Sequence, residues 1–191
     1  MEDSILTTRN RLCSDMVLTL TGFMGSGQTT IGKALAAKVG CPFLDLDQVI
    51  EEAKGMSIPE IFAAEGETAF RKAELEALER LVGDKSKSGK IEYVLALGGG
   101  TVMTPGCEKL VRENTRCVYL KASAETLLAN LEGTQSSRPM LRGEDLRTRI
   151  ENLLEEREET YERCAEITVD SETPLYELIP LLHVLDTELK G

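Results

Sequence analysis

The stretch Gly22-Phe23-Met24-Gly25-Ser26-Gly27-Gln28-Thr29-Thr30 decides the fold of this chain, because it matches the pattern G-x-x-x-x-G-K-[ST] at all positions but one. The departure is Gln28, which stands where the pattern has a lysine. An apolar run at 16–21 precedes the stretch, and apolar residues at helical spacing follow it from 31 to 39. A strand, a glycine-rich turn and a helix start form the setting in which backbone N–H groups bind phosphate. We therefore predict a phosphate-binding loop; an ordinary glycine-rich turn is the alternative.

The length and composition indicate one soluble globular domain. The chain has 191 residues, of which 41% are apolar and 29% are charged, as is usual for such a domain. We expect residues 16–191 to form it and residues 1–15 to be an N-terminal extension without the apolar segment of a secretory signal. No apolar run is long enough to span a bilayer.

The charge balance argues against two classes of partner. Lys and Arg total 22 against 33 Asp and Glu, so the net charge is −11. Nucleic acids and anionic membranes repel such a protein, and we expect neither as a partner. The five cysteines, at 13, 41, 107, 117 and 164, show neither a disulfide pattern nor zinc-site spacing. They indicate buried thiols and a cytoplasmic protein.

Short apolar runs alternate with helical patterns along the chain, which predicts an α/β domain with a largely parallel sheet. The expected strands lie at 17–21, 42–46, 91–97, 116–120 and 166–169, and the clearest helices lie at 67–82 and about 145–163. The polar segment 133–139 carries Arg138 between two helices. It is either an active-site lid or a plain surface loop.

Two segments follow predicted strands and suggest ligand contacts. Asp45 and Asp47 end the second strand, at the sheet edge where open parallel sheets bind ligands. One carboxylate would hold Mg²⁺ through water and the other would orient a substrate hydroxyl, unless both simply cap the next helix. Gly98, Gly99 and Gly100 follow the third strand. Three consecutive glycines are costly in chain entropy to order, so a structural reason for them is expected. Either the backbone approaches a ligand closely or it adopts positive φ angles, and a bare tight turn is the alternative.

Arg71 lies in the first turns of a predicted helix, where a cation gains nothing from the helix dipole. A partner such as a substrate carboxylate would explain it, and a solvated surface arginine is the alternative. Arg138 and Arg157 are further candidates, although spacing alone does not separate them from the arginines at 142, 147, 149 and 163.

Taken together, the chain resembles the shikimate kinases, which are small P-loop kinases of the nucleoside-monophosphate-kinase type. The matching stretches, in chain order, are GFMGSGQTTIGKALA, FLDLDQVIE, SIPEIFAAEGETAFRKAE, LALGGGTV, SRPML and REETYERCA. Gluconate and adenylate kinases share the first stretch but not the combination with the next three. The resemblance covers about 17–185 and implies one P-loop kinase domain with a five-stranded parallel sheet of order 2-3-1-4-5. It also implies flanking helices, a lid at about 132–144 and a monomer.

The resemblance implies transfer of the γ-phosphoryl group of ATP to the 3-hydroxyl of shikimate, in the pathway to chorismate and the aromatic amino acids. Asp47 would bind the shikimate hydroxyls, Arg71 and Arg157 its carboxylate, and the backbone of Gly98, Gly99 and Gly100 would lie against it. Thr29 would coordinate Mg²⁺, with Asp45 reaching the ion through water. The residues implied for ATP are Gly22, Gly25, Ser26, Gly27, Gln28, Thr29, Thr30 and Arg138. Asp47, Arg138 and Gln28 are the candidate catalytic residues.

Gln28 is the main departure from the family pattern. A glutamine amide donates a hydrogen bond but brings no charge, and losing one preorganised stabiliser costs about 2.7–4 kcal/mol, or roughly 10²–10³ in rate. Lys33 lies more than a turn farther along the helix and should point away from the phosphates. A second departure is the stretch 128–131, which lacks the arginine that the family often places before the lid.

Two hypotheses follow from the departure at Gln28. The first is a working, slower shikimate kinase, and the second is a relative that binds nucleotide or shikimate without turnover. The intact shikimate-side residues favour the first, because a protein that only binds has no need of the lid arginine or of both aspartates.

Overall fold

The computed structural model describes residues 16–132, 141, 145–174 and 176–177 of the chain. Within these residues a five-stranded sheet has the order β2-β3-β1-β4-β5, and every pair of neighbouring strands is parallel. The predicted α/β class and strand order are confirmed. The predicted N-terminal extension and nearly all of the predicted lid lie outside the described residues.

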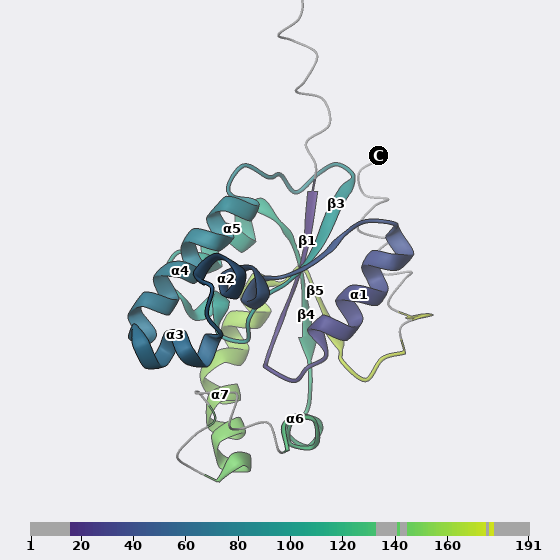
Figure 1. Cartoon of the computed structure of the whole chain (residues 1–191). Helices are drawn as coiled ribbons and strands as arrows, with labels where there is room; N and C mark the ends of the chain where they lie inside the picture. The colour runs from purple at the N-terminus through teal and green to yellow at the C-terminus, as the bar shows by residue number, and fades with distance from the viewer. Residues whose placement is uncertain (1–15, 133–140, 142–144, 175, 178–191) are drawn as a thin grey trace, which may run out of the picture.

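Strands and helices alternate along the chain, as the apolar periodicity predicts (Figure 1). The strands begin and end within a few residues of the predicted ranges, and the two clearest predicted helices correspond to α4 and α7. The elements, in chain order, are β1 (Met16–Gly22), α1 (Gln28–Val39), β2 (Phe43–Asp45), α2 (Leu46–Lys54), α3 (Ile58–Ala64), α4 (Gly66–Val82), β3 (Ile91–Ala96), the 3-10 turn η1 (Thr101–Met103), α5 (Cys107–Asn114), β4 (Arg116–Lys121), α6 (Ala124–Leu131), α7 (Leu146–Cys164) and β5 (Ile167–Asp170).

Strand β1 lies at the centre of the sheet and is buried along its whole length. Its side chains point to the two faces in turn, so that Leu18 and Leu20 pack with Leu35 of α1, whereas Val17 belongs to a second core. Residues of α2 to α7, together with residues of β1, β3 and β4, form that second core. Figure 1 shows the corresponding layers, with α1 on one side of the sheet and α2 to α5 and α7 on the other.

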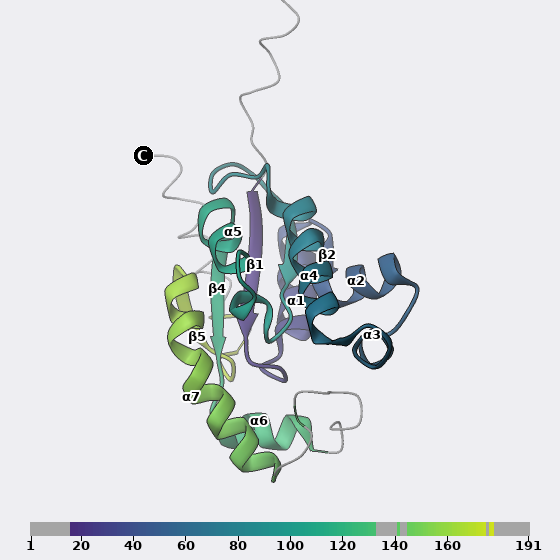
Figure 2. The ribbon, with the colours of Figure 1, turned by 90° about the vertical axis from the view of Figure 1, so that its left-hand side faces the viewer.

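The parallel sheet brings the segments that follow β1, β2 and β3 to one end of the strands. Leu20 of β1 and Asp45 of β2 are both in register with Ala96 of β3, so the loops after β1 and β3 and the start of α2 lie side by side. The predicted phosphate loop, Asp45, Asp47 and the glycine run 98–100 lie at or just after these strand ends, whereas Arg71 lies on α4. Figure 2 shows α7 running beside β4 and β5 and past the end of the sheet to α6. In the described part of the chain, no helix has the length and apolar character needed to cross a membrane.

Helix α1 packs closely on β2 at Gly32. A Cβ atom added at this glycine would lie 2.4 Å from the Phe43 Cε2 atom. We expect Gly32→Ala to lower the free energy of unfolding by about 1–3 kcal/mol through overpacking, although alanine favours the helix. Urea unfolding measures the effect. In a Phe43→Leu background the same change should cost less, and an unchanged cost would contradict the packing explanation.

Candidate functional site

The loop between β1 and α1 has the backbone geometry of an anion site. Gly27 has a φ of +89° and directly precedes the first residue of α1, a conformation that side chains disfavour. The Ser26 N–H donates to the Phe23 carbonyl at 3.0 Å. The Ser26 hydroxyl is buried and has no hydrogen-bond partner in the described part of the chain. A helix N-terminus with such an unpaired hydroxyl beside it suits a phosphate group.

Two amide side chains hold carbonyl groups of this loop. Gln28 folds back, and its Nε2 donates to the Gly22 carbonyl at 3.1 Å. Asn130 of α6 donates through Nδ2 to the Gly25 carbonyl at 2.9 Å. Lys33 points away from the loop as predicted, with its Nζ 5.9 Å from the centre of the Phe43 ring. The loop is therefore fixed by neutral groups.

Thr29 and Asp45 meet beside the loop. Thr29 Oγ1 donates to Asp45 Oδ2 at 3.0 Å, and Asp45 Oδ1 accepts from the Asp47 N–H at 3.1 Å. Asp45 is the N-cap of α2, so the capping alternative holds for this residue. A hydroxyl and a carboxylate side by side are ligands of the kind that Mg²⁺ prefers. No cluster of three or more His, Cys, Asp or Glu side chains suited to a metal occurs among the described residues.

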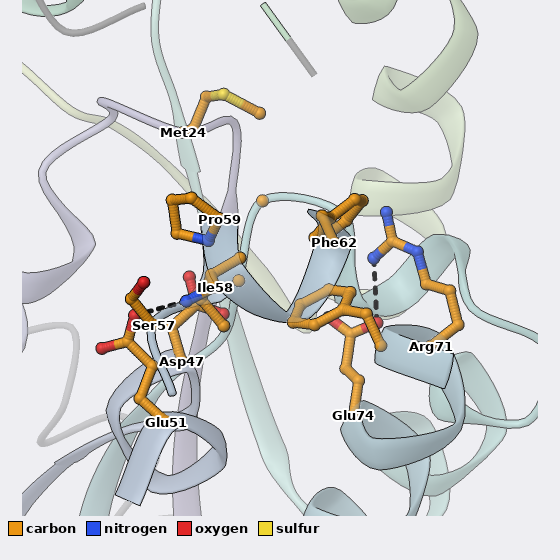
Figure 3. Close-up of a pocket in the computed structure, with 13 residues that line it drawn as sticks. Met24, Asp47, Glu51, Ser57, Ile58, Pro59, Phe62, Arg71 and Glu74 are labelled. Atoms are coloured by element: carbon orange, nitrogen blue, oxygen red, sulfur yellow. Dashed lines mark hydrogen bonds and ion pairs between the residues drawn. The ribbon is translucent and has the colours of Figure 1, made fainter. Parts of the chain in front are cut away.

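A cavity of about 420 Å³ opens next to the loop (Figure 3). Asp47 lies on one side of it and Arg71 on the other. Helix α3 supplies an apolar wall with Ile58, Pro59 and Phe62. A carboxylate and a guanidinium across an apolar-walled cavity suit a small molecule that has hydroxyl groups and a negative charge.

The glycine run 98–100 leaves room for other groups of the protein. An added Cβ would meet a different neighbour at each position: Asp47 Oδ1 at 2.8 Å from Gly98, the Met24 backbone nitrogen at 2.7 Å from Gly99, and the Arg71 guanidinium nitrogens at 3.0 Å from Gly100. None of the three glycines has a positive φ. The positive-φ explanation is therefore wrong here. The groups that approach the run closely in the structure belong to the chain itself, and contact with a ligand remains a prediction.

Two acids on α4 hold Arg71. Its Nη1 lies 2.9 Å from Glu74 Oε2, and its Nε and Nη2 donate to Glu67 Oε1 at 3.3 and 3.2 Å. Burial by itself lowers the pKa of Arg71, but the pairing with Glu74 and Glu67 outweighs it and raises the pKa, so the guanidinium stays charged. The expected partner of Arg71 is thus present within the protein, in addition to any ligand.

Glu74 completes this part of the site, and the sequence motifs do not predict it. Its side chain is only 1% exposed, and its carboxylate accepts from Thr101 Oγ1 at 2.8 Å and from Thr104 Oγ1 at 2.6 Å. A buried carboxylate is tolerated because it has a cationic partner and hydrogen bonds. The available signal is its place on the buried face of α4, which is otherwise apolar.

Arg157 approaches the glycine run from α7. Its Nη1 donates to the Gly99 carbonyl at 3.2 Å. It does not line the 420 Å³ cavity but shares a neighbouring hollow of about 370 Å³ with Arg71. The two arginines predicted to bind one carboxylate are thus brought together at the second hollow. Arg138 lies outside the described residues.

Comparisons with known proteins point to one family. A family model described as shikimate kinase matches residues 24–179. Shikimate kinases of Chlorobium limicola and Salinibacter ruber are 43% and 39% identical to this chain, over 80% and 84% of it and 77% and 79% of their own lengths. The structure of a shikimate kinase from Acinetobacter baumannii in complex with shikimate has a TM-score of 0.79 at 31% identity, over 90% of this chain and 93% of that one. For the shikimate kinase of Aquifex aeolicus the TM-score is 0.72 at 30% identity, with 89% and 95% covered.

The two acids that hold Arg71 allow a matched comparison of stability. We expect Glu74→Gln to lower the free energy of unfolding by about 2–4 kcal/mol, because it leaves a largely buried guanidinium without its buried counter-ion. Glu67 is 55% exposed, so Glu67→Gln should cost less than about 1 kcal/mol. Chemical unfolding of the two variants measures both values, and equal losses would show that burial of Glu74 does not matter.

Proposed function

This chain belongs to the shikimate kinase family, and we propose that it transfers the γ-phosphoryl group of ATP to the 3-hydroxyl of shikimate. This reaction is a step in the synthesis of chorismate and the aromatic amino acids. The observation that carries the proposal is the meeting of an anion-binding loop with a cavity that holds Asp47 and Arg71. Phosphoryl transfer requires this arrangement, because donor and acceptor must lie in line with water excluded.

We assign the substrate contacts from the positions of the charged groups. Arg71 would bind the shikimate carboxylate, since its guanidinium faces the cavity and stays protonated. Asp47, on the other side of the cavity, would hold the shikimate hydroxyl groups. It would accept the proton of the 3-hydroxyl while the 3-hydroxyl oxygen attacks the γ-phosphorus of ATP and ADP leaves. The backbone of 98–100 would lie against the ring. Arg157 would add a second cation from the neighbouring hollow.

We assign the nucleotide contacts to the loop. The backbone N–H groups from Gly25 to Thr30, together with the Ser26 hydroxyl, would surround the phosphates. The pairing of Thr29 with Asp45 supports a Mg²⁺ site there. When bound, the ion neutralises charge on the phosphate oxygens. Arg138, from the predicted lid, would add a cation over the phosphates.

Gln28 stands at the lysine position of the phosphate-loop pattern, and we propose that it shapes the loop instead of neutralising phosphate charge. Its bond to the Gly22 carbonyl supports this role. Residues 22–30 contain no Lys or Arg, so the positive charge at the phosphates would come from Mg²⁺ and Arg138. A slower enzyme is the expected consequence, and binding without turnover is the alternative.

We further propose that the chain acts as a monomer in the cytoplasm, with small molecules as its partners. The net charge of −11 supports the absence of nucleic-acid and anionic membrane partners. Burial raises the pKa of the Cys107 and Cys117 thiols to about 12, which keeps them unreactive and is compatible with a reducing compartment. A single kinase domain over 16–191, with a lid at 132–144 and an extension at 1–15, remains part of this proposal.

A coupled assay of ADP release tests the function and the role of Gln28. We expect shikimate-dependent ADP release from the unchanged protein and an increase in kcat of up to about 10²–10³ for Gln28→Lys, because the lysine restores one charge at the phosphates. Gln28→Met, of similar length but without a donor, is the control and should be slower than the unchanged protein. ADP release by Gln28→Lys but not by the unchanged protein would favour the hypothesis of binding without turnover. Calorimetry that detects binding of neither ATP nor shikimate would exclude both hypotheses.

Replacement of Arg71 tests the placement of the two ligands. We expect Arg71→Ala to raise the KM for shikimate by roughly 10- to 100-fold, because a charge-assisted hydrogen bond is lost, with little change in the KM for ATP. Arg71→Lys retains the charge without the planar guanidinium group, so its KM for shikimate should lie between those of the unchanged protein and Arg71→Ala. The exposed Arg80 of the same helix provides the control Arg80→Ala. Equal effects on both KM values would contradict the assignment.

A further inference from the structure

The carbonyl groups of the glycine run 98–100 are held in two different ways. The Gly98 carbonyl accepts from the Thr101 N–H at 3.1 Å, and the Gly100 carbonyl accepts from the Met103 N–H at 3.0 Å. Both bonds belong to the turn that leads into η1. The turn therefore fixes the first and the last carbonyl of the run, and the middle carbonyl is fixed from elsewhere.

Helix α7 holds the middle carbonyl. The Gly99 oxygen accepts from Arg157 Nη1 and from the Tyr161 hydroxyl, which uses both of its lone pairs. The Tyr161 side chain is fully buried, and its ring stacks on Tyr119 with 5.2 Å between the ring centres. Burial raises the pKa of Tyr161 to about 12, so its hydroxyl remains a donor at neutral pH.

The direction of this carbonyl sets the direction of the next N–H group. No cis peptide bond occurs within the described residues, and in a planar trans peptide the Gly100 N–H points opposite to the Gly99 carbonyl. The carbonyl points toward Arg157 and Tyr161, which are not among the described residues that line the 420 Å³ cavity, whereas Gly100 is. The Gly100 N–H therefore points away from Arg157 and Tyr161, and Gly100 itself lines the cavity.

We propose that Tyr161 is a positioning residue for substrate binding. By holding the Gly99 carbonyl, Tyr161 orients the Gly100 N–H toward shikimate. It also fixes the position of the carbonyl oxygen to which Arg157 donates, and thereby the orientation of the Arg157 guanidinium. Glycine has more backbone freedom than any other residue, so a run of three would not hold this peptide plane without a partner outside the turn. Tyr161 acts through the peptide and does not contact the substrate. The inference rests on the function proposed above.

Tyr161→Phe tests the inference, because it removes the hydroxyl and retains the stacked ring. We expect the KM for shikimate to rise about five- to tenfold, as for the loss of one buried hydrogen bond, with kcat and the KM for ATP little changed. Tyr119→Phe is the matched control, since it removes a phenol from the same ring pair and leaves the Gly99 carbonyl untouched. Its KM for shikimate should equal that of the unchanged protein. An equal rise in both variants, or none in Tyr161→Phe, would overturn the inference.

A second measurement needs no variant. In the ¹⁵N-labelled unchanged protein, the Gly100 amide resonance should shift when shikimate is added, and an unperturbed resonance would overturn the inference even if Tyr161→Phe failed to fold. The two proposals fail separately. A protein that neither binds nor phosphorylates shikimate contradicts the proposed function, whereas normal turnover with a silent Gly100 amide contradicts only the role of Tyr161.

Discussion

The site depends on the close approach of two stretches of backbone. The Met24 nitrogen, in the phosphate loop, lies 2.7 Å from the position that a Cβ atom of Gly99 would occupy. No side chain fits between them, so the loop and the glycine run are in contact through their main chains. Because close-packed groups have few ways to shift, this contact fixes the distance between the two regions that would hold the donor phosphate and the acceptor hydroxyl.

Neutral side chains hold the backbone of the predicted phosphate loop. Gln28 and Asn130 hold carbonyl groups of the phosphate loop, and the cation that faces the cavity, Arg71, is already paired with Glu74 and Glu67. In the described part of the site, neutral amides hold the loop and acidic side chains neutralise Arg71. Oriented dipoles cost no reorganisation during the reaction, which is why they stabilise developing charge effectively.

Local pattern predicts much of this molecule, and long-range contact decides the rest. The phosphate loop, the strands and the strand order follow from apolar periodicity, from glycine spacing and from the family resemblance. The sequence does not predict the role of Glu74, because its partners Thr101 and Thr104 are about thirty residues away along the chain and meet it only in the folded protein. The hydrogen bond from Arg157 to the Gly99 carbonyl is not predicted for the same reason. The Gln28 amide also turns back to a backbone group, and residue type alone gives no direction to a side chain.

The glycine run and the α3 wall differ in how far they tolerate change. A side chain at Gly99 would collide with the Met24 backbone, and one at Gly98 or Gly100 would displace the side chain of Asp47 or Arg71, so an alteration there requires compensation on another element. Ile58, Pro59 and Phe62 face the cavity with apolar surface and lie on a short helix at the periphery of the molecule. Substitutions that let the cavity accept a differently shaped ring would therefore be tolerated first at the α3 wall, where they change the shape of the cavity and leave the glycine run and its neighbours unchanged.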